Sequence, residues 1–181
     1  MSEPTAWTGP RIGSGIDVHA FGAPADVPSP DGASLVLAGV VIPSHAPLEG
    51  HSDADVVAHA VIDALLGAAG LGDIGERFGT DDPELDGADS MRMLADVVAD
   101  VAAAGWVTGN VDVTVVAARP RVAPHRAAMR DRLAAVLGVD ADVVSVKATT
   151  TDGLGSIGRG EGIAAWAVAV LRPAVPGGRA D

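Results

Sequence analysis

The chain has 181 residues, of which 48% are hydrophobic, so it can bury a core and is not an intrinsically disordered protein. Its formal net charge of −12 and its dispersed basic residues argue against a nucleic-acid partner. Cysteine is absent, which excludes disulfides and thiolate metal sites, and without a signal-peptide pattern or a membrane-length apolar stretch we expect a cytoplasmic protein with no membrane partner.

Both ends of the sequence lack hydrophobic periodicity. We expect flexible termini at residues 1–10 and 173–181 and a single domain over residues 11–172. No internal repeat and no second-domain boundary interrupts that domain.

The first predicted strand, residues 11–21 (RIGSGIDVHAF), carries an acidic residue and a histidine two positions apart. Side chains at i and i+2 of a strand lie on the same face, so Asp17 and His19 could point at one metal ion. A D-x-H pair alone also suits the polar face of an edge strand. A third ligand from elsewhere would favour the metal site.

A second strand is predicted at residues 34–42 (SLVLAGVVI), and a long helix follows it after a loop. Ser52 and Asp55 form an S-x-x-D pattern, which predicts the start of this helix, and Gly70 predicts its end. His51 and Ser52 would then lie at the helix N-terminus, where free N–H groups favour anions.

This helix is apolar almost all round except for one titratable stripe. At about 100° per residue, Asp55, His59 and Asp63 share one face, and Ile62 and Leu66 flank it. Apolar flanks suggest that the stripe faces a pocket or an interface, where His59 offers a third metal ligand. The alternative is that His59 and Asp63 only satisfy each other as an i, i+4 pair.

A Gly-, Asp- and Pro-rich segment follows the helix at residues 72–90 and predicts a long loop. Loops of this length in compact domains are often functional. Asp73, Asp81 and Asp82 could form turns or bind hydroxyl groups or metal, and their spacing favours turns.

The remaining sequence alternates helices and strands. An amphipathic helix is predicted at residues 90–104, strands at residues 110–117, 143–148 and 163–171, and a further helix that Pro124 opens. The run TTTDGLGSIGRGEG between the last two strands is rich in hydroxyl groups and then in glycine. That composition is typical of a segment whose backbone approaches a ligand.

These elements predict an α+β fold with one mixed β-sheet covered by helices on one face. We expect the opposite face to be apolar too, because of Val111, Val113 and Val115. A single chain cannot leave such a face in water, so the pattern predicts oligomerisation through the sheet.

The chain resembles the 2-C-methyl-D-erythritol 2,4-cyclodiphosphate synthase family over residues 11–171 in five segments, which are RIGSGIDVHAF, GHSDADVVAHAVIDALLGAAGLGDIGERF, GADS, GNVDVTVVA and KATTTDGLGSIGRGEGIAA. The resemblance implies a phosphorus–oxygen lyase of the non-mevalonate isoprenoid pathway. Such an enzyme converts 4-diphosphocytidyl-2-C-methyl-D-erythritol 2-phosphate into the cyclic diphosphate and CMP. It also implies a homotrimer that packs its sheets around a central cavity, which can hold an isoprenoid diphosphate, with active sites at the subunit interfaces.

The resemblance assigns roles to matching positions. Asp17, His19 and His59 match the ligands of one zinc ion per chain, and Asp152 matches a ligand of a second divalent ion, Mg²⁺ or Mn²⁺, where glutamate is commoner. His51 and Thr150 match residues that stabilise the transition state, Asp63 would orient the His59 imidazole, and Arg159 would line the central cavity. The substrate-binding positions that it implies are Asp17, His19, His51, Ser52, Asp73, Ile74, Gly75, Ala117, Arg121, Ala123, Thr149, Thr150, Thr151, Asp152, Ser156 and Arg159.

Two histidines and one carboxylate would leave the fourth position of a zinc ion for a phosphate oxygen, as a catalytic zinc requires. Two alternatives stay open. A metal-dependent phosphohydrolase would use the same ligands with water as the nucleophile. A non-catalytic trimeric binder of isoprenoid diphosphates would use zinc structurally, and would need four protein ligands where the sequence offers three.

Overall fold

The computed structural model describes residues 7–23, 32–50, 52–79 and 87–174, and a four-stranded mixed β-sheet is the base of its fold. The strand order is β1-β6-β4-β5, with the bounds β1 Arg11–Ala20, β6 Gly162–Pro173, β4 Trp106–Val116 and β5 Val144–Thr149. β6 is antiparallel to both neighbours, and β5 is parallel to β4. The predicted α+β fold with one mixed sheet is confirmed.

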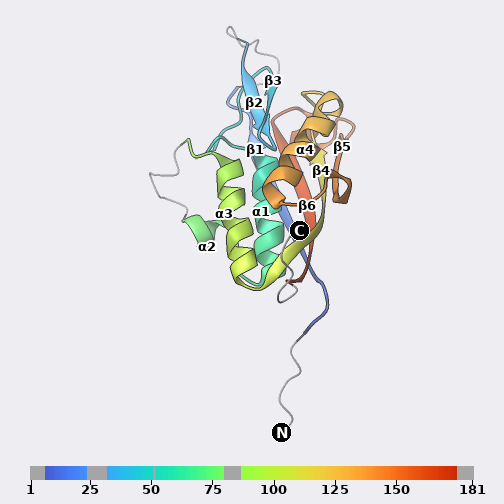
Figure 1. The fold of residues 1–181 in the computed structure, drawn as a ribbon. Coiled ribbons are helices and arrows are strands. Elements are labelled where there is room, and N and C mark those ends of the chain that lie inside the picture. The colour runs from blue at the N-terminus through green and yellow to red at the C-terminus, as the bar shows by residue number, and fades with distance from the viewer. Residues whose placement is uncertain (1–6, 24–31, 51, 80–86, 175–181) are drawn as a thin grey trace.

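Three longer helices cover one face of this sheet (Figure 1). They are α1 (Val56–Ala69), which lies on β1 and β6, α3 (Ser90–Ala103), which packs against α1, and α4 (Arg126–Leu137). The shorter segments are α2 (Ile74–Phe78), η2 (Ala123–His125), η3 (Ala141–Val143) and α5 (Gly155–Gly158). Across the described ranges, no helix is both long and apolar enough to cross a membrane.

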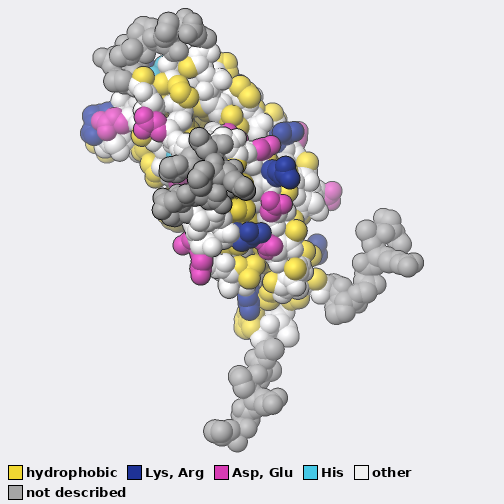
Figure 2. Space-filling model, turned by 90° about the vertical axis from the view of Figure 1, so that its left-hand side faces the viewer, with side chains coloured by type: hydrophobic (Ala, Val, Ile, Leu, Met, Phe, Trp, Pro, Cys, Tyr) yellow, Lys and Arg dark blue, Asp and Glu magenta, His cyan; other side chains and the backbone are white. Residues whose placement is uncertain are grey.

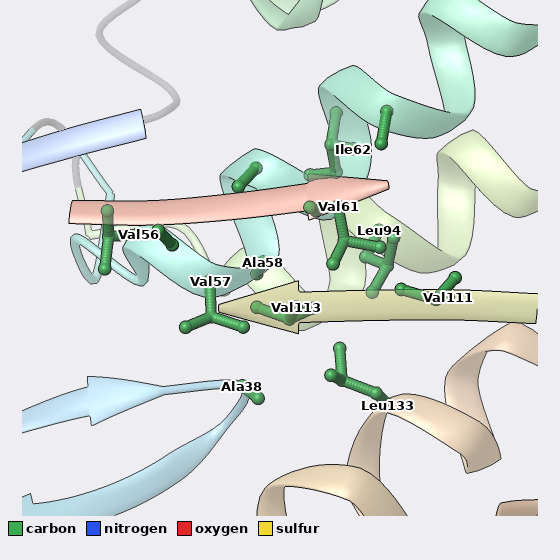
Figure 3. Packing of buried hydrophobic residues seen from close by; sticks show 14 of the residues in the cluster. Ala38, Val56, Val57, Ala58, Val61, Ile62, Leu94, Val111, Val113 and Leu133 are labelled. Carbon is green, nitrogen blue, oxygen red and sulfur yellow. The ribbon is translucent and has the colours of Figure 1, made fainter. Parts of the chain in front are cut away.

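The core lies between the sheet and these helices. Figure 3 shows Val57 and Val61 of α1, Leu94 of α3, Val113 of β4 and Leu133 of α4 in one cluster, and all five are fully buried. The cluster surrounds α1, which explains why the sequence of this helix is apolar on nearly every side.

The open face of the sheet carries other residues than those predicted. Val111, Val113 and Val115 are buried on the helix side, so the prediction that they form the open face was wrong. The strand alternates between its two faces, and the sequence alone does not say which phase faces the helices. The exposed large apolar side chains of the open face are Ile12, Ile16, Val18 and Trp166, which are between 53 and 72% exposed.

The segment predicted as one strand at residues 34–42 is a hairpin. β2 (Ser34–Leu37) and β3 (Val40–Pro43) form a separate two-stranded sheet, joined by Ala38 and Gly39 with φ of 51° and 68°. Positive φ at both central residues is the type I′ pattern, for which Asn, Asp or Gly is usual. Because the first of these positions is an alanine, the sequence does not predict this turn.

A buried carboxylate joins this hairpin to α1. The Oδ1 atom of Asp55 accepts hydrogen bonds from the backbone N–H groups of Val57, Ala58 and Ala38 at 3.1, 3.0 and 2.8 Å. Its Oδ2 atom accepts one from Gly39 at 2.7 Å. Asp55 is therefore the N-cap of α1 and at the same time the anchor of the hairpin turn.

The helix consequently starts three residues later than predicted. Ser52 is not its cap, since Ser52 forms a parallel bridge with Ala88, and the cap role belongs to Asp55. Asp55 also does not belong to the polar stripe, because it is completely buried. The predicted end is correct, since Gly70 closes α1 in a left-handed conformation.

α2 interrupts the segment predicted as a loop at residues 72–90. The Nε atom of Arg77 in α2 donates to Asp100 of α3 at 2.6 Å. Figure 2 views the molecule from this side and shows acidic and basic side chains interspersed over the surface. Residues 80–86, which include the predicted turn formers Asp81 and Asp82, lie outside the described residues.

Two glycines of β1 let α1 lie directly on the strand. A Cβ atom at Gly13 would come within 2.1 Å of the carbonyl oxygen of Ala64, and one at Gly15 within 2.2 Å of that of Ala60. No side chain fits at such distances. The contact brings the polar stripe of α1 alongside the second half of β1.

We expect Gly15→Ala to lower the free energy of unfolding by about 3 kcal/mol or more, because the added methyl group must push α1 away from β1. The urea midpoint measures this loss. The matched control is Gly67→Ala on the same helix, where a Cβ would meet no atom within 4 Å. It should leave stability unchanged or raise it by up to about 1 kcal/mol, since alanine favours helix over glycine. Equal midpoints for Gly15→Ala and the wild type would contradict direct packing of the helix on the strand.

We expect Asp55→Asn to lower the free energy of unfolding by about 1–3 kcal/mol, because the amide group must turn an N–H toward at least one buried backbone N–H. The control is Asp89→Asn. Asp89 is the exposed N-cap of α3, and among the described residues it accepts through Oδ1 alone, from Met91 and Arg92, so an amide oxygen can replace it. Similar losses in the two variants, measured by urea titration, would show that the second oxygen of Asp55 is dispensable.

Candidate metal centre

Asp17, His19 and His59 place three ligand atoms side by side. The Oδ2 atom of Asp17 lies 2.9 Å from Nε2 of His19 and 2.9 Å from Nδ1 of His59, and the two nitrogens are 3.1 Å apart. The side chains are 12 to 26% exposed, which keeps the group partly shielded but open to a ligand. The group could hold a metal ion, as the D-x-H pair and the polar stripe predict.

Two elements bring these side chains together. Asp17 and His19 extend from the face of β1 that carries the two glycines, and His59 follows one turn after the cap at Asp55. Gly50 lies directly against this site, because a Cβ there would lie 2.9 Å from the His19 ring. The site thus depends on the helix start and on the close contact of helix and strand.

An ionised carboxylate lies between two imidazoles. Burial raises the pKa of Asp17, but hydrogen bonds and charge interactions with His19 and His59 outweigh burial and hold that pKa well below its usual range. Burial lowers the pKa of His19, but the hydrogen bond and the charge interaction with Asp17, together with smaller contributions from Glu49 and Asp55, outweigh burial and raise the pKa overall. A metal ion binds only the unprotonated Nε2 of His19, so metal and proton compete for this atom.

The ring nitrogens of His19 and His59 that face away from Asp17 also have hydrogen-bond partners. Nδ1 of His19 lies 2.5 Å from the carbonyl oxygen of Glu49, so it donates and leaves Nε2 free for the metal site. Nε2 of His59 lies 2.9 Å from the hydroxyl of Ser90 and 3.0 Å from that of Ser52. The Glu49 contact uses the backbone and therefore has no signal in the sequence, and the sequence around Ser90 indicates only the start of a helix.

Asp63 has a different partner from the one predicted. Its Oδ1 atom accepts from the backbone N–H of Ile74 at 2.8 Å, and burial raises its pKa. Among the described residues, Asp63 is not a hydrogen-bond partner of the His59 ring, so it does not orient that ring directly. Asp73 is the N-cap of α2, and the segment predicted to bind hydroxyl groups, Asp73 to Gly75, forms the start of this helix.

A second group of predicted positions surrounds a pocket at the ends of β4 and β5. The pocket has a volume of about 180 Å³. Its lining includes the predicted substrate-binding residues Ala117, Arg121, Ala123, Thr149 and Thr150. The fold therefore gathers positions from two separate segments into one hollow.

The chain beyond β5 forms a tight turn. The hydroxyl of Thr150 donates to Oδ1 of Asp152 at 2.8 Å and accepts from its backbone N–H at 3.1 Å. Asp152 has a φ of 52°, and Thr151 donates to the carbonyl oxygen of Leu154 at 2.6 Å. The Asp152 side chain is exposed and is held at the rim of the pocket by the Thr150 contact.

Two further predicted residues, Ser156 and Arg159, belong neither to the metal-ligand candidates nor to the printed lining of the pocket, and a third lies outside the described residues. Ser156 is exposed in α5, and Arg159 donates to Glu161 at 2.6 Å in a hydrogen bond that raises the pKa of the arginine. His51 lies outside the described residues, so its roles stay predictions.

The metal-ligand candidates and the pocket lie at opposite edges of the sheet. Asp17 pairs with Ala165, Ala165 with Val115, and Val115 with Ala148, so one row of residues runs from β1 to β5. Three strand spacings of roughly 4.8 Å separate the two edges by about 14 Å. Within one chain, the structure does not bring Asp152 to the metal-ligand candidates.

Comparison with known proteins extends over nearly the whole chain. The model of the YgbB family matches residues 10–172. The 2-C-methyl-D-erythritol 2,4-cyclodiphosphate synthase of Rubrobacter xylanophilus is 54% identical over 167 residues, which cover 92% of this chain and 98% of that one. The protein of the same name from Moorella thermoacetica is 55% identical over 161 residues, or 89% and 94% of the two chains.

Solved structures share the fold. The bifunctional IspDF of Campylobacter jejuni superposes with a TM-score of 0.83 at 40% identity, and the match covers 91% of this chain and 42% of that larger chain. The CDP complex of IspF from Plasmodium falciparum superposes with a TM-score of 0.79 at 30% identity, covering 94% of this chain and 100% of that one.

Proposed function

This chain belongs to the YgbB family, and on that basis we infer that it converts 4-diphosphocytidyl-2-C-methyl-D-erythritol 2-phosphate into 2-C-methyl-D-erythritol 2,4-cyclodiphosphate and CMP. Relatives at 54 and 55% identity carry the name of this activity, which belongs to non-mevalonate isoprenoid synthesis. The reaction class would be that of a metal-dependent phosphorus–oxygen lyase.

The observation that supports this chemistry is the triangle of Asp17, His19 and His59, which we assign to zinc. A tetrahedral zinc ion with ligand bonds of about 2.0–2.1 Å holds neighbouring ligand atoms about 3.3 Å apart. The three atoms here are 2.9–3.1 Å apart, so small movements suffice to accept the ion. When bound, zinc supplies a Lewis acid for a phosphate oxygen at its fourth position.

The reaction needs no nucleophile from the protein. The 2-phosphate oxygen of the substrate attacks the β-phosphorus, the bond from that phosphorus to the CMP oxygen breaks, and CMP leaves. Because both groups belong to one molecule, holding it folded back can supply about 7–11 kcal/mol of the barrier reduction. The chain therefore has to bind both ends of the substrate and hold them close together.

Separate parts of the chain suit those two ends. We assign the methylerythritol hydroxyls to residues 73–75 and the 2-phosphate end to His51 and Ser52. The cytidyl end would occupy the pocket beside Thr149 and Thr150. Relatives of the same fold solved with CDP support a nucleotide ligand. Asp152 at the rim of that pocket would hold Mg²⁺ or Mn²⁺ on the diphosphate.

We propose that each active site is shared between two chains of a homotrimer. The proposed reaction would need both ions beside the same substrate, yet the edges that carry Asp17 and Asp152 lie about 14 Å apart in one chain. A neighbouring chain would bring the β5 edge to the β1 edge and would cover the apolar open face around Ile16 and Trp166. Arg159 would then line a central cavity that can hold an isoprenoid diphosphate.

Mass spectrometry of the product tests the function. The cytidyl substrate with zinc and magnesium should give the cyclic diphosphate and CMP in equal amounts, whereas a linear phosphate would indicate a phosphohydrolase. His59→Ala should abolish turnover and zinc retention, because two ligands hold the ion poorly. Zinc is counted by metal analysis of the dialysed protein.

The control for this variant is His125→Ala at the start of α4, which should keep the zinc content of the wild type. A His59→Ala protein that turns over normally and carries normal zinc would refute the ligand assignment.

Asp152→Asn should raise the magnesium concentration required for half-maximal rate and lower turnover, while zinc content stays near that of the wild type. The reason is that the amide loses the charge that attracts magnesium, and the zinc ligands lie on other segments. Loss of zinc in this variant, or an unchanged magnesium dependence, would show that Asp152 is not the second-metal ligand.

The same variant tests the shared site. Trimers assembled from His59→Ala chains and Asp152→Asn chains contain one kind of interface with an intact triad and an intact Asp152. Mixed trimers, purified through two different tags, should therefore turn over faster than trimers of either variant alone. No recovery would mean that both groups act within one chain.

A further inference from the structure

A chain of three side chains extends from the metal centre to the start of α3. Nε2 of His59 lies 2.9 Å from the hydroxyl oxygen of Ser90, and that hydroxyl donates to Oδ1 of Asp53 at 2.5 Å. Ser90 is fully buried, and Asp53 is partly buried. The function assigned above uses neither Ser90 nor Asp53.

The direction of these hydrogen bonds is determined by simple donor counting. The Ser90 hydroxyl has a single proton and donates it to the carboxylate oxygen Oδ1 of Asp53. The Ser90 oxygen can then only accept, which requires a proton on Nε2 of His59. A neutral imidazole with its proton on Nε2 presents the lone pair of Nδ1, and Nδ1 is the nitrogen that faces Asp17 and His19.

Two neighbours do not impose this tautomer. Ser52 lies 3.0 Å from the same nitrogen, but its hydroxyl can donate or accept, and it also lies 3.1 Å from the Ser90 oxygen. Asp17 favours the opposite tautomer in the metal-free protein, because a proton on Nδ1 of His59 could bond to its carboxylate. The Ser90 and Asp53 pair is therefore the part of the surroundings that favours the metal-binding form.

The backbone holds this pair in place. The N–H of Asp53 donates to the carbonyl oxygen of Ala88 at 3.0 Å, and Ser52 and Ala88 form a parallel bridge. The loop before α1 is thus fixed to the segment before α3, with Asp53 directed at the first residue of α3. This arrangement keeps the accepting carboxylate in reach of Ser90.

We propose that Ser90 and Asp53 are positioning residues that hold His59 in the tautomer with the proton on Nε2 and fix its ring plane, so that Nδ1 is ready for the metal ion. The proposal rests on the metal centre assigned above. Outer hydrogen bonds of this kind typically contribute 10- to 100-fold to metal affinity. Neither residue touches the substrate in this role.

Zinc titration of the metal-free protein, with a competing chelator, tests the proposal. Ser90→Ala should weaken zinc binding by about 10- to 100-fold. Asp53→Ala should weaken it similarly, and the double variant should be little worse than either single one, because both changes break the same chain of hydrogen bonds. Ser90→Thr, which keeps the hydroxyl, should restore most of the affinity.

Nitrogen-15 NMR of the His59 ring in the metal-free protein gives a readout that does not depend on activity. At a pH where the ring is neutral, Ser90→Ala should lower the fraction with the proton on Nε2 relative to the wild type. The structural control is Asp89→Ala, which removes the cap of α3 but keeps the Ser90 hydroxyl. It should lower stability and leave zinc affinity and the tautomer ratio unchanged.

These experiments test the metal centre and the positioning role separately. If the wild type binds no zinc, the metal centre itself is wrong. If the wild type binds zinc and Ser90→Ala binds it equally well with the same tautomer ratio, only the positioning role is overturned. Equal weakening by Asp89→Ala and Ser90→Ala would also overturn it, because loosening of α3 would then explain the effect.

Discussion

The rest of the structure depends on where α1 begins, and one buried carboxylate sets that point. Asp55 accepts hydrogen bonds from the first turn of α1 and from the hairpin turn at Ala38 and Gly39. Because the start of the helix is fixed, His59 comes one turn later beside β1. The loop between the hairpin and the helix is anchored at both of its ends, and this loop carries the Glu49 carbonyl that holds His19. A single acceptor group thus contributes to the placement of both imidazoles.

The candidate centre joins parts of the chain that lie far apart in sequence. His59 is 42 residues from Asp17 and 31 from Ser90. An ion held by β1 and α1 would bind the folded chain and not the unfolded one, so it would add to stability by mass action. In a chain without cysteine, such an ion would act as the cross-link that disulfides supply elsewhere.

Much of the fold and the inner part of the site could be predicted from the sequence, because hydrophobic periodicity and side-chain spacing are local properties. The strand of Asp17 and His19 and the helix of His59 are examples. The hairpin at residues 34–42 could not be predicted, because Ala38 has a positive φ in its turn and an alanine does not indicate that conformation. The faces of β4 were assigned in the wrong phase, because alternation does not say which side meets the helices. Ser90 and Asp53 were missed because their roles exist only once two distant segments meet.

The glycines of β1 also determine how this strand pairs. β1 is an edge strand of the four-stranded sheet, held on one side by β6, and glycine-rich strands are prone to slip along a partner. A slip by one residue would turn Ile12, Ser14 and Ile16 toward α1, where the backbone of the helix leaves no room for any side chain. Steric clashes with α1 therefore exclude the shifted alignment of β1. Two missing side chains specify the alignment that sets Asp17 and His19 opposite His59, and they do so before any ligand is bound.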